Sequence, residues 1–309
     1  MPGHTTSQTS RAVLCLASCL LLADASYAEA DASQAQTDAS QAPSEPQSEP
    51  EFYSLKEWAP VHTWQLVAIP TVAAATIGIS TINVNSPHWT GGILFDDGVR
   101  GALRLKSAAA RSHAASWSDY LLYGVGTLPF LIDAVILTGV VHKRMDLAWQ
   151  MFVLDAEAIT LSAFMDTSTK VIAGRQRPFA RECETNPTLP DCGGSGANLS
   201  FFSGHAAIVS TAATLRCLQH LDLHLYGNAL ADGAACGFAV VVAATTGLLR
   251  VTSDQHYLTD VLAGAAVGAG AAALVYAIHV RPTAKGGGPI PLSVHFRRDF
   301  MGVTYGLVF

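Results

Sequence analysis

The chain has 309 residues, of which 50% are hydrophobic and only 14% charged, and its formal net charge is −6. Its mean hydropathy of +0.30 favours a membrane-embedded or membrane-associated protein, although Ala- and Gly-rich soluble helical bundles reach similar values. No basic stripe or aromatic-basic interleaving is present, which argues against nucleic-acid binding.

Residues 1–30 have the pattern of a secretory signal peptide. Arg11 supplies the positive charge, Ala12–Ala23 form the apolar core, and Ala28–Ala30 is a small-x-small cleavage site. Leu16–Cys19 also resembles a lipoprotein box, but the apolar run continues beyond it, which favours ordinary cleavage. We therefore expect an exported protein, either in the inner membrane with a periplasmic active site or in the periplasm.

Residues 31–51 form a polar, low-complexity linker that has almost nothing to bury, so we expect it to be disordered. Residues 52–285 then have the size of one helical domain. Long apolar stretches predict an all-α bundle of about six core helices: Trp64–Val84, Tyr120–Val141, Leu147–Met165, Ala206–Leu221, Ala234–Leu249 and Leu258–Val280. The basic segment Gly98–Trp117 is expected on the cytoplasmic side or at a lipid surface.

The number of membrane crossings stays open. Trp64–Val84 has 21 uncharged residues, enough to span a bilayer, whereas charges interrupt several later stretches. If the N-terminus is exported and the first three stretches all cross, the segment after Met165 lies in the cytoplasm. That placement conflicts with a disulfide in the loop that follows.

Cysteines and the C-terminal tail give two further expectations. Cys183 and Cys192 bracket a loop, and export makes a disulfide between them plausible, whereas Cys217 and Cys236 lie in apolar stretches and are interpreted as small core residues. Residues 286–309 alternate apolar and polar side chains, which predicts a short β-hairpin tail.

Three polar segments interrupt the apolar helices. In the first, Lys170 and Arg177 are two helical turns apart and are expected to share a helix face, with Pro178 placing Arg177 near the helix end. In the second, Ser203 and Gly204 open a helix whose first N–H groups favour an anion.

The third segment carries Arg250, His256 and Asp260. His256 and Asp260 are four residues apart, so Asp260 can accept from one imidazole nitrogen and leave the other free as a nucleophile. With His205, the three segments supply three cations, a hydroxyl, two histidines and a carboxylate. This set suits a phosphate dianion, which one His attacks while the other protonates the leaving oxygen, and it requires no metal.

Lys170-x6-Arg177-Pro178, Ser203-Gly204-His205 and Arg250-x5-His256-x3-Asp260 together resemble the signature of the phosphatidic acid phosphatase type 2 superfamily. The resemblance implies His256 as the nucleophile that forms a phosphohistidine, Asp260 as its orienting group and His205 as general acid and then base. It implies a phosphate site made of Lys170, Arg177, Ser203, Gly204 and Arg250. Phe202 and Leu249 depart from the family, which usually has Pro and Ser there.

The expected function is therefore a phosphomonoesterase that uses no cofactor, acting on a phosphorylated lipid at a membrane. Three alternatives stay open: a soluble periplasmic acid phosphatase acting on small phosphomonoesters, a vanadium-dependent haloperoxidase, and a non-catalytic envelope membrane protein. Vanadate is a cofactor under the second of these alone. The oligomeric state is not predicted.

Overall fold

The structure is a computed structural model that describes residues 58–126, 128–183, 186–188, 192 and 196–280, and the backbone of 292–297 and 300–305. The expected signal peptide, residues 1–30, and the linker, residues 31–51, lie outside the described residues.

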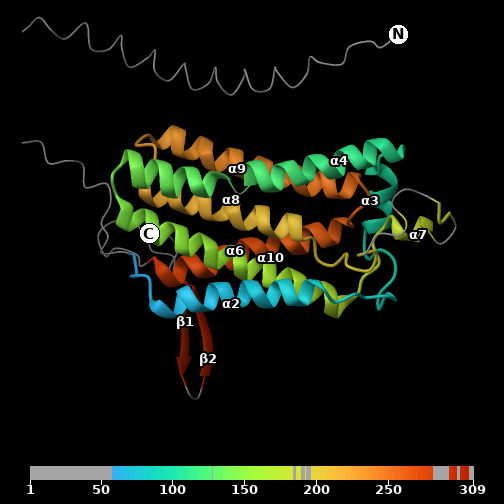
Figure 1. The fold of residues 1–309 in the computed structure, drawn as a ribbon, viewed down its shortest axis with the longest axis horizontal. Helices are drawn as coiled ribbons and strands as arrows, with labels where there is room; N and C mark the ends of the chain where they lie inside the picture. Colours follow the sequence, from blue (N-terminus) through green and yellow to red (C-terminus); the bar gives the residue numbers. More distant parts are fainter. Residues whose placement is uncertain are drawn as a thin grey trace, which may run out of the picture. The chain divides into compact units, whose positions relative to one another are not determined.

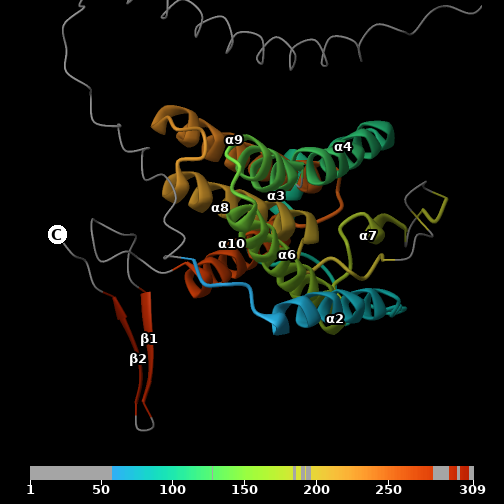
Figure 2. The ribbon, with the colours of Figure 1, turned by 60° about the vertical axis from the view of Figure 1, so that its left-hand side comes forward.

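Helices make up almost all of the described domain, which confirms the expected all-α fold. Its helical elements are α2 (Thr63–Ser80), α3 (Asp96–Leu103), α4 (Ala108–Tyr120), η2 (Leu121–Gly126), α5 (Leu128–Phe130), η3 (Leu131–Val141), α6 (Met145–Ala173), α7 (Ala180–Cys183), α8 (Gly204–Leu223), α9 (Ala229–Thr252) and α10 (Leu258–His279). The long helices run side by side, and α8 lies between α9 and α10 (Figures 1 and 2).

Backbone contacts show that successive long elements run in opposite directions. At one end of the bundle, which we call the site end, His88 N donates to Gly174 O at 3.0 Å and Leu105 N to Thr252 O at 3.0 Å. At the far end, Trp58 forms a β-bridge with Val280. The loops after α2, α6 and α9 therefore meet at the site end, although the sequence separates them widely.

The helix ends follow from local chemistry. Ser203 caps α8 by accepting from Ala206 N, and Asn228 caps α9 by accepting from Leu230 N and Ala231 N. Gly174 ends α6 in the left-handed conformation with φ of 52°, where a residue without Cβ is favoured.

The segment between α4 and α6 is largely π-helical, unlike the regular helix that the apolar stretch Tyr120–Val141 predicted. Pro129 has no N–H to continue the α-helical ladder. The hydroxyl of Thr138 donates to Asp133 O, five residues earlier, at 2.7 Å. Both features favour a wider helical turn here.

The main hydrophobic core lies toward the far end. It is built from Leu147, Met151 and Leu154 of α6 with Leu215 of α8 and Tyr276 of α10. Carboxylates that interrupt the apolar stretches bond across helices, as expected from their burial.

Two such pairs cross from neighbouring helices to α8. Asp155 accepts from Gln219 Nε2 at 2.6 Å, and Asp133 lies 2.8 Å from Arg216. These buried polar side chains therefore join neighbouring helices of the bundle.

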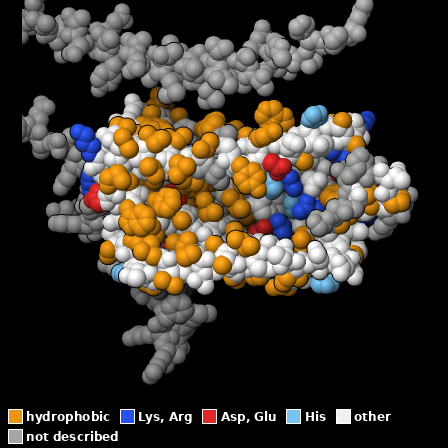
Figure 3. Space-filling view, in the orientation of Figure 1, with side chains coloured by type: hydrophobic (Ala, Val, Ile, Leu, Met, Phe, Trp, Pro, Cys, Tyr) orange, Lys and Arg blue, Asp and Glu red, His pale blue; other side chains and the backbone are white. Residues whose placement is uncertain are grey.

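Four helices are long and apolar enough to cross a bilayer: α2, α6, α9 and α10. One face of the bundle is broadly hydrophobic, and charged and His side chains gather in one area of it (Figure 3). Within α2, Gln65 is the one buried residue, and its amide contacts Glu157 and His279 at 2.7 Å each. By length and composition, the bundle suits a membrane protein.

Strands β1 (Leu292–Arg297) and β2 (Phe300–Tyr305) pair antiparallel, with Leu292 opposite Tyr305. The hairpin expected for the tail is present.

Candidate active site

The three predicted polar segments come together at the site end of the bundle. Lys170 lies in the last turn of α6, Ser203 caps α8, Arg250 lies in the last turn of α9, and His256 precedes α10. Polar side chains thus converge from four helix ends.

Arg177 reaches this cluster from a loop. The expectation that Lys170 and Arg177 share a helix face is wrong, because α6 ends at Ala173 and Gly174 turns the chain away. Arg177 N instead donates to Ala197 O at 2.7 Å, and its guanidinium donates to Gln255 Oε1 at 2.5 Å.

Two of the three cations keep an unused donor. The Nε atoms of Arg177 and Arg250 are buried and have no hydrogen-bond partner among the described residues. Burial lowers the pKa of Arg177, and the neighbouring Asp166 and Asp260 oppose that shift. Buried donors without acceptors are costly, so these two groups suit an anionic ligand.

At position 204, glycine leaves room for two charged side chains of α6. A Cβ there would lie 2.5 Å from Asp166 Oδ2 and 3.0 Å from Lys170 Nζ. Lys170 and Asp166 pair at 2.9 Å directly against the start of α8. The absence of a side chain at Gly204 therefore lets a cation approach the free N–H groups of the helix.

His256 is held with one ring nitrogen available. Its Nδ1 lies 2.8 Å from Ser200 O, and because a carbonyl only accepts, Nδ1 must carry the proton. Burial, with the charges of Arg177 and Arg250, lowers the pKa of His256 well below its usual value. The ring is therefore neutral near pH 7, with a lone pair on Nε2.

Asp260 orients His256 through Ser200. The expected direct hydrogen bond is absent: Asp260 Oδ2 and His256 Nδ1 are 3.8 Å apart, because His256 lies before α10 and Asp260 lies within it. Asp260 instead accepts from Ser200 Oγ at 2.6 Å and from Tyr257 N at 3.0 Å. The carboxylate thus fixes the residue whose carbonyl holds the ring.

Arg175 completes this support, and sequence reasoning missed it. Its fully buried guanidinium donates to Asp260 at 2.5 Å and to Asp96 at 2.8 Å, and it lies between the rings of Trp89 and Tyr257. Asp96 is also buried. The one sequence signal for Arg175 was its position between Lys170 and Arg177 in the first polar segment.

His205 faces a carboxylate from α4. Its Nε2 lies 2.6 Å from Asp119 Oδ1. Burial and the charge of Arg250 lower the pKa of His205 to about 4, and Asp119 opposes this shift. Asp119 carried no sequence signal, because it lies between the basic segment Gly98–Trp117 and the apolar stretch Tyr120–Val141.

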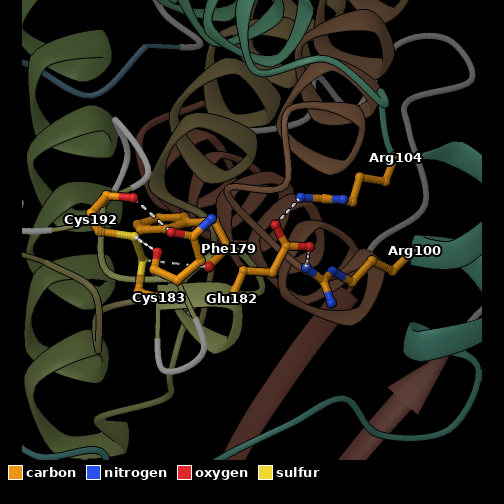
Figure 4. Close-up of a disulfide and its surroundings, with 8 residues drawn as sticks. Arg100, Arg104, Phe179, Glu182, Cys183 and Cys192 are labelled. Carbon is orange, nitrogen blue, oxygen red and sulfur yellow. Dashed lines mark hydrogen bonds and ion pairs between the residues drawn. A yellow bond between two sulfur atoms is a disulfide. The ribbon is translucent and has the colours of Figure 1, made fainter.

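Two arginines of that basic segment contact the turn that carries His256. Arg100 and Arg104 both donate to the buried carboxylate of Asp254, two residues before His256, at 2.6 to 2.7 Å. Both arginines also contact Glu182, beside the Cys183–Cys192 disulfide (Figure 4). These two arginines of Gly98–Trp117 thus face the protein, and the membrane side of the segment stays a prediction.

A second disulfide joins Cys217 of α8 to Cys236 of α9. The interpretation of these two residues as unpaired core cysteines is wrong, because the adjacent helices bring their sulfurs together. Among the described residues, no group of three or more His, Cys, Asp or Glu side chains could hold a metal ion.

Comparisons with known proteins agree with the motif. A family model described as PAP2 superfamily matches residues 153–284. A lipid A 1-phosphatase of Porphyromonas gingivalis is 32% identical over 145 residues, 47% of this chain, and the match spans 27% of that relative.

One solved structure is also similar. It is described as the first transmembrane PAP2 type phosphatidylglycerolphosphate phosphatase from Bacillus subtilis, with a TM-score of 0.44, 18% identity, and coverage of 70% of this chain and 94% of that chain. The match to the PAP2 superfamily model thus spans residues 153–284, which include all three polar segments.

Proposed function

We propose that this protein is a membrane phosphatase that hydrolyses a lipid phosphomonoester through a phosphohistidine at His256. The observation that carries the proposal is the pair of buried, unused Nε donors on Arg177 and Arg250 beside a neutral His256. Together they provide an anion site and a nucleophile at the same helix ends.

In the first step, the phosphoryl oxygens bind Lys170, Arg177 and Arg250, the Ser203 hydroxyl and the first N–H groups of α8. The Nε2 lone pair of His256 attacks phosphorus as the bond to the leaving oxygen breaks. His205 gives its proton to that oxygen.

In the second step, His205 takes a proton from water, and the resulting hydroxide attacks the phosphohistidine. The P–N bond breaks, its electron pair returns to His256, and inorganic phosphate leaves. The described side chains carry each proton transfer in this scheme, so the phosphatase uses no metal in it.

A lipid substrate is supported by the surroundings of the site. Four neighbouring helices are apolar enough to lie in a bilayer, and Trp117, Tyr120 and Tyr123 are exposed on the segment that carries Asp119. Exposed Trp and Tyr side chains are enriched at membrane interfaces, where a phosphorylated lipid head would enter.

A phosphorylated glycolipid is a second candidate substrate. The P. gingivalis relative is named for action on lipid A, and its similarity to this chain is the specific observation in favour. Phosphatidate and lipid A are thus the two lipids to compare first.

We also place the site end at the periplasmic face of the inner membrane. The loop closed by Cys183–Cys192 lies at this end, and disulfides persist in the periplasm.

The test is phosphate release from phosphatidate, from lipid A and from p-nitrophenyl phosphate in mixed micelles containing EDTA. His256→Ala serves as the blank. Preference for a lipid, with acid-labile phosphate bound to wild-type protein alone, is the expected result.

Turnover of p-nitrophenyl phosphate equal to that of the lipids would contradict a lipid phosphatase and support a soluble acid phosphatase. No release above the blank would refute the phosphatase. Halide oxidation that requires vanadate would then support a haloperoxidase.

A further inference from the structure

Two neighbouring residues at the end of α4 contact two groups of the proposed site. Ser118 Oγ accepts from Arg250 Nη1 at 3.1 Å. Asp119 Oδ1 lies 2.6 Å from His205 Nε2 and 3.7 Å from Arg250 Nη1. Both residues lie outside residues 153–284, which match the family model, so the motif does not include them.

We propose that Ser118 and Asp119 are positioning residues of the active site, with Asp119 holding His205 in one tautomer and favouring its protonated form, and Ser118 orienting the guanidinium of Arg250. The proposal rests on the proposed function, in which His205 transfers protons and Arg250 binds phosphate.

Asp119 determines which nitrogen of His205 transfers protons. A carboxylate at 2.6 Å accepts, so Nε2 carries a proton in both charge states of the ring. Nδ1 has no hydrogen-bond partner among the described residues, and it is the nitrogen that exchanges its proton with the leaving oxygen and with water.

Asp119 also supplies the opposing charge that His205 needs. The groups that face His205 from other elements are Lys170 of α6, Arg250 of α9 and His256 of the turn before α10. Each cation disfavours an imidazolium, whereas the α4 carboxylate favours it. Without Asp119, the acid form of His205 would be scarcer at any given pH.

Ser118 is arranged to accept from Arg250. Its fully buried hydroxyl donates to Ala115 O at 2.6 Å, which commits its proton to the helix backbone and leaves its lone pairs for the guanidinium. Leu249 stands where the family usually has a Ser beside this Arg. The hydroxyl next to Arg250 comes from α4 instead.

A purely structural role does not account for Asp119. Its side chain is 49% exposed, and an ion pair with that much solvent contact contributes little to folding stability. Its replacement is therefore expected to change proton transfer and leave stability almost unchanged.

The first experiment compares Asp119→Asn and Asp119→Glu with wild type. Asparagine can keep a hydrogen bond to Nε2 but removes the charge. We expect it to lower kcat about tenfold, with KM nearly unchanged, and to move the alkaline limb of the pH profile down by about one unit. Asp119→Glu should restore part of both. Asp146→Asn is the matched control, because Asp146 is also half-exposed and paired with an Arg, Arg144.

The second experiment tests the hydroxyl. Ser118→Ala is expected to weaken the binding of inorganic phosphate, measured by calorimetry, and to raise KM, each about tenfold, because Arg250 loses its acceptor. Ser118→Thr should retain wild-type affinity. Ser116→Ala, an exposed serine on the same helix, is the control.

Failure of this proposal can be told from failure of the proposed function. NMR titration of His205 and calorimetry with phosphate need no turnover. An unchanged His205 pKa in Asp119→Asn, or unchanged phosphate affinity in Ser118→Ala, would overturn the corresponding half. Absence of phosphate release from wild-type protein would refute the function alone.

Discussion

Gly268 lies at a close contact between α8 and α10, the helices that carry the two halves of the site, and its replacement tests the site geometry. A Cβ at Gly268 would lie 2.0 Å from Ala207 O of α8, and real Cβ contacts essentially never fall below 3.0 Å. Gly268→Ala must therefore separate α8 and α10 locally by about 1 Å. The Thr211 hydroxyl crosses the same contact, donating to Gly268 O at 3.1 Å.

The separation acts on catalysis because the two helices carry different partners. Ser203 and His205 open α8, and His256 immediately precedes α10. A misplacement of about 1 Å can cost about 10²-fold in rate, and overpacking costs about 1–3 kcal/mol in stability. We expect both losses in Gly268→Ala, measured as kcat for phosphate release and as Tm in detergent.

Gly270→Ala, on the same helix, is the control. A Cβ at Gly270 meets nothing within 4 Å. This variant should keep the wild-type kcat and Tm. If Gly268→Ala behaved as Gly270→Ala does, the close α8–α10 contact would not control the site, and the geometric argument would fail.

Three other predictions follow from contacts at the site end. Arg175→Met leaves Asp96 and Asp260 buried without their cation and should cost about 3–5 kcal/mol, seen as a large fall in Tm. Because its pKa is lowered to about 4, His205 loses its proton early, so kcat/KM should fall with rising pH along a limb below the usual His value of 6.5; a limb above it would contradict His205 as the acid. Reporters inserted near residue 60 and residue 187 should lie on opposite sides of the membrane, and a shared side would contradict the crossings.

The reporter prediction bears on the expected signal peptide. Three segments that could each cross the membrane separate residues 58–62 from the loop that carries Cys183–Cys192: α2, α4 to η3, and α6. A periplasmic site therefore needs the start of α2 on the cytoplasmic side. An exported residue 52 and a periplasmic His256 are incompatible when all three segments cross.

Much of the site could be predicted from the sequence because its groups lie in short segments at helix ends. Ser203 and Gly204 predict the start of α8, and Arg250 lies at the end of an apolar stretch. Each of these signals is local, and the alternating directions of successive long helices bring the residues to one end of the bundle.

The supporting residues could not be predicted in this way, because their roles depend on tertiary contacts. Asp119 lies 86 residues from His205, and Arg100 lies 154 residues from Asp254. The sequence pattern placed Arg100 in a segment expected on the cytoplasmic side or at a lipid surface, and it gave Asp119 no role. Gly174 shows a different limit, since one left-handed residue removed Arg177 from the helix that the spacing predicted.

The Cys217–Cys236 disulfide has a consequence for how the protein is assembled. Cys217 is 13 residues beyond Gly204 in α8, about 20 Å along the helix axis from the site end. If the site end lies at the surface of a hydrocarbon layer about 30 Å thick, as the proposed placement of the site implies, that depth holds no water.

Thiol oxidation and exchange proceed through a thiolate, which an apolar medium disfavours. The bond between α8 and α9 must then form while both cysteines still contact water. Biogenesis would have a fixed order, in which these two helices pair and oxidise first and lipid closes around them afterwards.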